Sequence, residues 1–148
     1  MTPIALSRLN DPLFASGRKT RSTDVIVFNT TPLEFTLEES DCVEGEFTEE
    51  FRPDSVLSPS TSIIYGSDGD SGVDCKVKYA TEDGSYFQVG LTNPLSGKKE
   101  FVMELTPDLV VSVDMGTGAN NVVKVIVKEN PDYVPEEYEE EVVPVGSK

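Results

Sequence analysis

The sequence predicts an all-β protein: an antiparallel β-sandwich of about eight strands, with a flexible N-terminal arm and an acidic C-terminal tail. Three observations support this fold class. Short segments rich in Val, Ile, Phe and Tyr recur about every 8 to 12 residues. Clusters of Gly, Pro, Asn and Asp separate these segments. No segment combines the 3.6-residue apolar period of an amphipathic helix with helix caps.

The chain of 148 residues is long enough for one domain with a sizeable core. We expect an arm over residues 1–22, the sandwich over 23–128 and a tail over 129–148. The arm carries four basic residues and two prolines without a sustained apolar period. The tail, ENPDYVPEEYEEEVVPVGSK, is dominated by acidic residues. Such like-charge runs are usually disordered or serve as interaction segments.

The first strand signals lie in the N-terminal half. VIVFN at 25–29 is a compact β-branched run, and LEFTL at 33–37 alternates apolar and polar residues. GEFTEEF at 45–51 contains two aromatic residues, and STSIIYG at 60–66 precedes an acidic, glycine-rich turn. VDCKVKY at 73–79 has the clearest two-residue period, with Val, Cys, Val and Tyr on one face.

The remaining strand signals follow a Glu-Asp-Gly turn at 82–84, which predicts a hairpin. SYFQVGL at 85–91 returns antiparallel to the preceding strand. EFVMEL at 100–105, LVVSVDM at 109–115 and NVVKVIVK at 121–128 complete the set. The glycine-rich DMGTGAN lies between the last two strands. It predicts a hairpin loop and not a phosphate-binding loop, because no helix follows it.

The charge balance excludes some functions. The chain has 27 acidic and 12 basic residues, no histidine and a net charge of −15. Nucleic acid is excluded as a partner, because it requires clustered Lys and Arg. No apolar run is long enough to span a bilayer as a helix, and no classical signal peptide is visible. Localisation therefore stays unknown, with a cytoplasmic location and secretion by a non-classical route both open.

No catalytic or metal site is predicted. Without histidine, Ser-His and Cys-His arrangements cannot form. Glu38/Glu39 and Glu49/Glu50 are pairs of adjacent carboxylates. Because neighbouring residues of a strand point to opposite faces, we expect neither pair to act as acid and base on one substrate. The acidic turn GSDGDSGVD at 66–74 lacks the ligand spacing of an EF-hand loop. We therefore expect a protein that is not an enzyme and binds no cofactor or metal.

The two cysteines, Cys42 and Cys75, leave two alternatives. They form a disulfide if adjacent strands bring them together, or they stay reduced as small buried hydrophobic residues. We favour the reduced state. Two separated thiols without histidine do not make a zinc site.

A fixed order of motifs extends from residue 24 to residue 100. VIVFNTT is followed by LEFTLEES, a turn at Gly45, the proline-containing RPDSVLSPST and the strand SIIYGS. After a turn at Gly72 come VDCKVKYA and SYFQVGLTNPLSG, whose strand ends in an Asn-Pro-x-x-Gly pattern. This order resembles the aegerolysins, small acidic β-sandwich proteins of fungi and bacteria. It is also similar to the wider actinoporin-like group, which includes the fungal fruit-body lectins.

The resemblance implies binding of membrane sphingolipid, or of a glycan, through loops at one end of the sandwich. Several aegerolysins form pores only with a larger protein partner that carries a membrane-attack-type domain. This chain has no tryptophan, and Trp and Tyr are the side chains that best match the headgroup layer. We therefore expect it to bind lipid and to need a partner for pore formation.

Candidate ligand-binding residues lie near the predicted turns. They are Tyr65, Tyr79, Tyr86, Phe87, Asn93 and Pro94. The competing interpretation is that the aromatic rings fill the core, as alternating aromatic residues of a strand usually do. Two other functions stay open: a soluble lectin-like or protein-binding sandwich, and a structural subunit that forms homo-oligomers.

Overall fold

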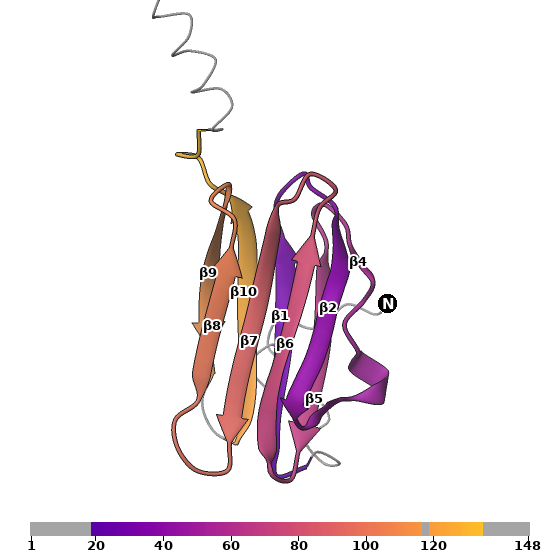
Figure 1. Ribbon diagram of the computed structural model, residues 1–148, viewed down its shortest axis with the longest axis vertical. Coiled ribbons are helices and arrows are strands. Elements are labelled where there is room, and N and C mark those ends of the chain that lie inside the picture. Colours follow the sequence, from indigo (N-terminus) through magenta and orange to yellow (C-terminus); the bar gives the residue numbers. More distant parts are fainter. Residues whose placement is uncertain (1–18, 117–118, 135–148) are drawn as a thin grey trace, which may run out of the picture.

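The computed structural model describes residues 19–116 and 119–134, which form two five-stranded sheets packed face to face (Figure 1). Sheet A has the strand order β3-β5-β1-β10-β9, and sheet B has the order β4-β2-β6-β7-β8. Neighbouring strands are antiparallel except β1 and β10, which are parallel. The bounds are β1 Arg21–Asn29, β2 Phe35–Glu44, β3 Glu46–Phe47, β4 Val56–Leu57, β5 Ser62–Gly69, β6 Gly72–Ala80, β7 Tyr86–Pro94, β8 Glu100–Leu105, β9 Leu109–Met115 and β10 Asn120–Glu129.

The predicted all-β sandwich is confirmed, with ten strands in place of about eight. The predicted strand at 45–51 is wrong beyond Phe47, because the chain enters a short 3-10 helix, η2 (Glu49–Phe51). Phe47 meets Tyr65 edge-to-face at 6.1 Å and packs against the core, whereas Phe51 packs against a separate outward cluster. One continuous strand would place both rings on the same face, since they are four residues apart.

The core lies between the sheets and is built from alternate residues of each strand. Val25 and Val27 of β1 face Val77 and Tyr79 of β6, and all four are at most 1% exposed. Burying side chains of this size contributes about 1.5 to 3 kcal/mol each. The strand alternation in the sequence is therefore the main source of stability.

Cys42 and Cys75 form a disulfide, so the favoured reduced state is wrong. The two residues stand opposite each other on β2 and β6, with Cα atoms 4.0 Å apart. β4 pairs only with the first two residues of β2, so the rest of β2 forms the edge of sheet B. The disulfide links this edge segment to β6. The β2–β6 pairing contains two register irregularities. The sequence pattern alone therefore could not predict that Cys42 and Cys75 stand opposite each other.

The predicted arm, 1–22, and tail, 129–148, lie mostly outside the described residues. β1 begins at Arg21 and β10 ends at Glu129. The division into arm, sandwich and tail therefore stays a prediction, as does homo-oligomer formation. In the part of the chain that the structure describes, no helix is long and apolar enough to cross a bilayer.

The sandwich has two ends, which we name after the first and last residues of β1. The Arg21 end is at the bottom of Figure 1 and the Asn29 end is at the top. The described connections at the Arg21 end are residues 45, 70–71, 95–99, 116 and 119. Those at the Asn29 end are 30–34, 58–61, 81–85 and 106–108.

Candidate functional site

The six predicted ligand-binding residues do not form one surface. Tyr65, Tyr79 and Phe87 belong to the core and are at most 4% exposed. The Tyr79 hydroxyl donates a hydrogen bond to the carbonyl of Asp54 at 2.6 Å. Burial raises the pKa of the Tyr65 and Tyr79 phenols well above the usual value. These three rings therefore fill the sandwich and do not face a ligand.

Tyr86 and Pro94 are half-buried and lie at opposite ends of β7. The Lys78 ammonium lies 4.4 Å from the centroid of the Tyr86 ring, a cation–π contact that occupies one ring face. The hydrogen bond from Lys78 to Glu38 is the main reason why the pKa of Lys78 is raised. Contact of Tyr86 or Pro94 with a ligand stays a prediction.

Glu38 and Glu39 both reach lysines of β6, so the expectation that they point to opposite faces is wrong. Glu38 pairs with Lys78 at 2.8 Å, and Glu39 pairs with Lys76 at 3.7 Å. The irregularity in the β2–β6 register at this point allows both carboxylates to approach the same strand. Each carboxylate is paired with its own lysine, and such exposed pairs contribute little stability.

The acidic turn holds the chain in place before β1. Asp70 accepts hydrogen bonds from the backbone N–H and the hydroxyl of Thr20, at 3.1 and 3.2 Å. Asp68 accepts one from the backbone N–H of Lys19 at 3.4 Å. Among residues 19–116 and 119–134, no group of three or more His, Cys, Asp or Glu could hold a metal ion.

Asn93 links the two sheets at the Arg21 end. Its side chain is 1% exposed and donates hydrogen bonds to the carbonyls of Ser22 at 3.0 Å and Ala119 at 2.9 Å. Gly72, with φ +115°, lets the start of β6 lie close to the end of β7, because a Cβ at this position would lie 3.2 Å from the Pro94 Cα. The Asn-Pro-x-x-Gly turn thus begins with a structural contact.

Arg21 crosses the same end from sheet A to sheet B. Its Nε donates to the Pro94 carbonyl at 3.1 Å and its Nη2 to the Leu95 carbonyl at 2.9 Å. Nη1 donates to the Thr20 carbonyl at 3.1 Å. A guanidinium has five N–H groups, so two have no partner within the described structure. Arg21 takes part in none of the ion pairs there.

Lys99 comes from the other sheet and approaches Arg21. It directly precedes β8 and is half-buried, two residues before Phe101, which packs against the core. Partial burial and the neighbouring Arg21 charge lower the pKa of Lys99. In the same loop, Lys98 is exposed and Leu95 is 47% exposed. We call Arg21, Leu95 and Lys99 the basic rim.

A buried polar layer lies beneath the basic rim, one inward position further along β1. The Thr23 and Ser67 hydroxyls share a hydrogen bond of 2.7 Å. Asn121 stands next to Thr23 across the β1–β10 pair and is fully buried. Neither its Nδ2 nor its Oδ1 has a hydrogen-bond partner within the described part of the chain. This end therefore keeps unused hydrogen-bonding capacity.

The connections at the two ends differ in charge. Those at the Asn29 end contain Glu34, Glu82, Asp83 and Asp108 and no basic residue. Among the described residues, those at the Arg21 end contain Lys98, Lys99 and Asp70, and the adjoining strand ends add Glu44, Glu46, Asp68, Asp74 and Glu100. The positive charge of the Arg21 end is therefore local to Arg21 and the loop 95–99.

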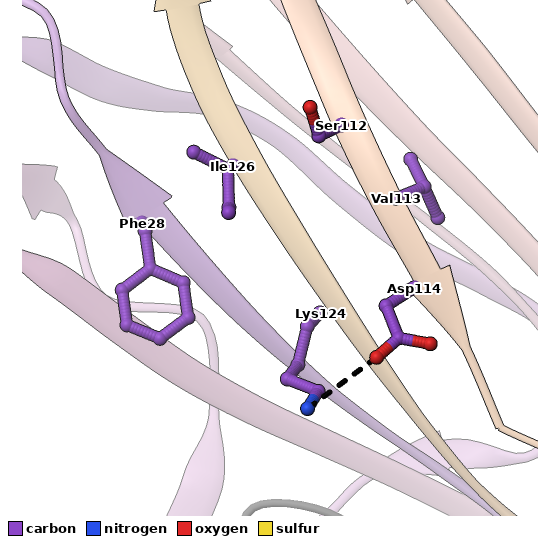
Figure 2. A pocket seen from close by; sticks show the side chains of 6 residues that line it. All are labelled: Phe28, Ser112, Val113, Asp114, Lys124 and Ile126. Carbon is purple, nitrogen blue, oxygen red and sulfur yellow. Dashed lines mark ion pairs between the residues drawn. The ribbon is translucent and has the colours of Figure 1, made fainter.

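A second candidate site is a hollow on the outward face of sheet A (Figure 2). It has a volume of about 220 Å³ and is lined by Phe28, Ser112, Val113, Asp114, Lys124 and Ile126. Lys124 pairs with Asp114 at 3.4 Å, so its charge is already balanced. Pockets for small molecules usually measure about 300 to 1,000 Å³. The hollow is therefore small for an organic ligand.

Sequence reasoning missed the basic rim as a site. It assigned Arg21 to the arm and did not single out Lys98 or Lys99. The available signal was the Gly-Lys-Lys run directly after the Asn-Pro-x-x-Gly turn, in a chain with a net charge of −15. Its convergence with Arg21 depends on contacts between residues more than 70 positions apart in the sequence.

Comparison with solved structures identifies proteins that share this fold. The lipid-binding protein Nakanori matches with a TM-score of 0.72 at 13% identity, over 79% of this chain and 75% of that chain. IP-1A from Alcaligenes faecalis matches with a TM-score of 0.61 at 14% identity, over 76% and 94% of the two chains. RahU, solved in complex with a TRIS molecule, gives 0.60 at 10% identity, over 77% and 98%.

These neighbours are aegerolysin-type structures, so the resemblance seen in the order of the motifs is confirmed at the level of the fold. The likeness shows that this chain shares their β-sandwich fold. No family model matches the sequence, and no curated protein matches it.

Proposed function

We propose that this chain is a non-catalytic protein that binds membrane lipid through the Arg21 end of its sandwich. The observation that carries the proposal is the basic rim, where Arg21 and Lys99 have no carboxylate partner among the described residues and lie beside the exposed Leu95. Cationic and apolar side chains side by side fit the bilayer surface, where headgroups cover acyl chains. The fold shared with the lipid-binding protein Nakanori supports this proposal.

The lipid that we propose is a sphingolipid with a zwitterionic headgroup. The resemblance to the aegerolysins suggests the lipid class. The net charge of −15 would repel an anionic membrane, but a headgroup without net charge exerts no such repulsion. Specific binding to a neutral membrane then depends on local contacts at the rim.

Pore formation, in this proposal, requires a second, larger protein. Among the described residues near the Arg21 end, exposed apolar side chains are few and scattered, such as Leu95 and Val43, at 47% and 82%. Two such side chains can hold a protein at the surface of a bilayer, since each buries a modest apolar area. They do not supply the apolar band of a membrane-spanning barrel.

Vesicle co-sedimentation tests the lipid-binding proposal. The vesicles contain phosphatidylcholine alone, sphingomyelin with cholesterol, or ceramide phosphoethanolamine, at about 0.15 M salt and again at high salt. We expect selective sedimentation with a sphingolipid. Binding should weaken but persist at high salt, because salt screens the cationic contacts of the rim and not the apolar contact of Leu95. Failure to sediment with any of the three vesicles would contradict the proposal.

A second candidate function is recognition of a glycan at the hollow of Figure 2. Phe28 offers an aromatic ring, and Ser112 and Asp114 offer hydrogen-bonding groups beside it. This combination of an apolar wall and a few polar groups is typical of small-molecule sites. Binding of a soluble glycan that Asp114→Asn abolishes and Lys99→Gln leaves unchanged would favour this function over lipid binding.

A further inference from the structure

We infer that Arg21 and Lys99 form a site for a phosphate group at the Arg21 end, where the strand ends of the two sheets face each other; we call this place the mouth. This inference rests on the proposed function, since it names the chemical group that a bound headgroup would present to the rim. A phosphate monoester, a phosphodiester headgroup and inorganic phosphate share the acceptor oxygens that such a site recognises.

The two cations approach the mouth from opposite sheets. Arg21 is the first residue of β1 in sheet A, and Lys99 directly precedes β8 in sheet B. The Pro94 and Leu95 carbonyls hold the guanidinium through hydrogen bonds of 3.1 and 2.9 Å. Arg21 is therefore positioned before any ligand arrives, which lowers the entropic cost of binding.

Four of the described lysines, Lys19, Lys98, Lys99 and Lys128, have an ammonium group with no carboxylate partner in the described structure, and of these only Lys99 is half-buried. Lys76, Lys78 and Lys124 each have an acidic partner within 4 Å. Arg21 and Lys99 have none in the described structure, although the chain carries 27 acidic residues. Two adjacent like charges repel each other, and an anion bound between them would remove that repulsion.

Hydrogen-bonding capacity supports a polar ligand at this mouth. Arg21 has two N–H groups without a partner among the described residues, and a lysine ammonium offers three more. Below them, the buried Asn121 amide has no partner there either. Buried polar groups nearly always have partners, in many cases ordered water. The mouth therefore suits a hydrated, oxygen-rich group better than an acyl chain.

An NMR titration with a matched pair of variants tests the site. Lys99→Gln and Lys98→Gln remove the same charge from neighbouring positions of one loop. Inorganic phosphate and phosphocholine are added separately, and the amides of Gly97 and Lys98 report binding, with Gly84 as the reference at the other end. We expect Lys99→Gln to weaken the affinity for both ligands by about five- to tenfold, since charge-assisted hydrogen bonds are lost. Lys98→Gln should change it less than about twofold.

Two results would overturn the site: no shift at the rim with either ligand, or equal weakening by the two variants. The same variants with sphingomyelin vesicles separate this inference from the proposed function. Phosphate binding that depends on Lys99, without vesicle binding, would keep the phosphate site and refute the membrane function. If Lys99→Gln binds vesicles as well as the wild type, and neither free ligand shifts the rim amides, the membrane function stands and the phosphate site is refuted.

Discussion

The two ends of the sandwich each contain a buried asparagine at the end of a strand, but the two residues are satisfied differently. Asn29 donates to the Leu33 and Ser58 carbonyls and accepts from the backbone N–H and hydroxyl of Thr31, at 2.7 to 3.1 Å. Asn93 donates to two carbonyls across the sheets. The Asn29 side chain thus joins loops of its own end, whereas the Asn93 side chain joins one sheet to the other.

This difference shows how one fold divides structure and binding between its ends. The Asn29 end has acidic connections, and both polar atoms of the Asn29 side-chain amide are hydrogen-bonded. This amide therefore has little capacity left to bind a ligand. The Arg21 end has cations without carboxylates in the described structure and an unsatisfied amide at Asn121. Unpaired groups in an otherwise satisfied structure are candidates for function.

The largest predicted effect concerns the covalent link in the Arg21 half of sheet B. We expect the double variant Cys42→Ser/Cys75→Ser to lose about 3 to 4 kcal/mol of the free energy of unfolding, because the unfolded chain regains the entropy of a closed loop. Chemical denaturation measures this loss. Amide exchange should accelerate at Val43 and Val73 more than at Gly84.

Reduced wild-type protein is the control for the disulfide, and it should match the double variant. A loss below about 1 kcal/mol would mean that the β2–β6 pairing holds without the covalent link. Equal acceleration of exchange at both ends would contradict a local effect.

The next prediction compares the two asparagines directly. Asn29→Ala should cost about 3 kcal/mol and Asn93→Ala about 2 kcal/mol, because the first leaves more buried groups without partners. Urea denaturation of both variants measures the two losses of unfolding free energy. A larger cost for Asn93→Ala would show that the hydrogen bonds between the sheets stabilise the fold more, against this expectation.

The smallest predicted effect is at Leu95, and it separates lipid contact from phosphate contact. Leu95→Ser should lower the affinity for sphingolipid vesicles by about three- to tenfold, because a half-exposed leucine contributes roughly 1 kcal/mol on insertion. The affinity for free phosphocholine should not change. Parallel loss of both affinities would indicate that the substitution has disturbed the loop.

The strands were predictable where one periodicity governs a segment. Residues 73–79 alternate strictly and lie within β6, and the prediction at 109–115 coincides with β9. The segment after Phe47 was not predictable, because its second aromatic packs on the other side of sheet A. The pairing of Cys42 with Cys75 depends on a register with two irregularities, which no local pattern contains.

Much less of the candidate site could be predicted. Aromatic residues near turns suggested ligand contacts, yet Tyr79 and Phe87 are buried because their strand positions face the other sheet. The basic rim depends on tertiary contacts: Arg21 and Lys99 are far apart in the chain and meet only when the sheets pack. Charge composition alone pointed away from cationic contacts, since it averages over both ends.

The most direct test of the central claim, that the Arg21 end is the binding end, is paramagnetic relaxation from a spin-labelled lipid in sphingomyelin bicelles. We expect strong broadening of the Leu95 and Gly97 amides and little change at Gly84 and Tyr133. Stronger broadening at Gly84 and Tyr133, or none at either end, would contradict this claim.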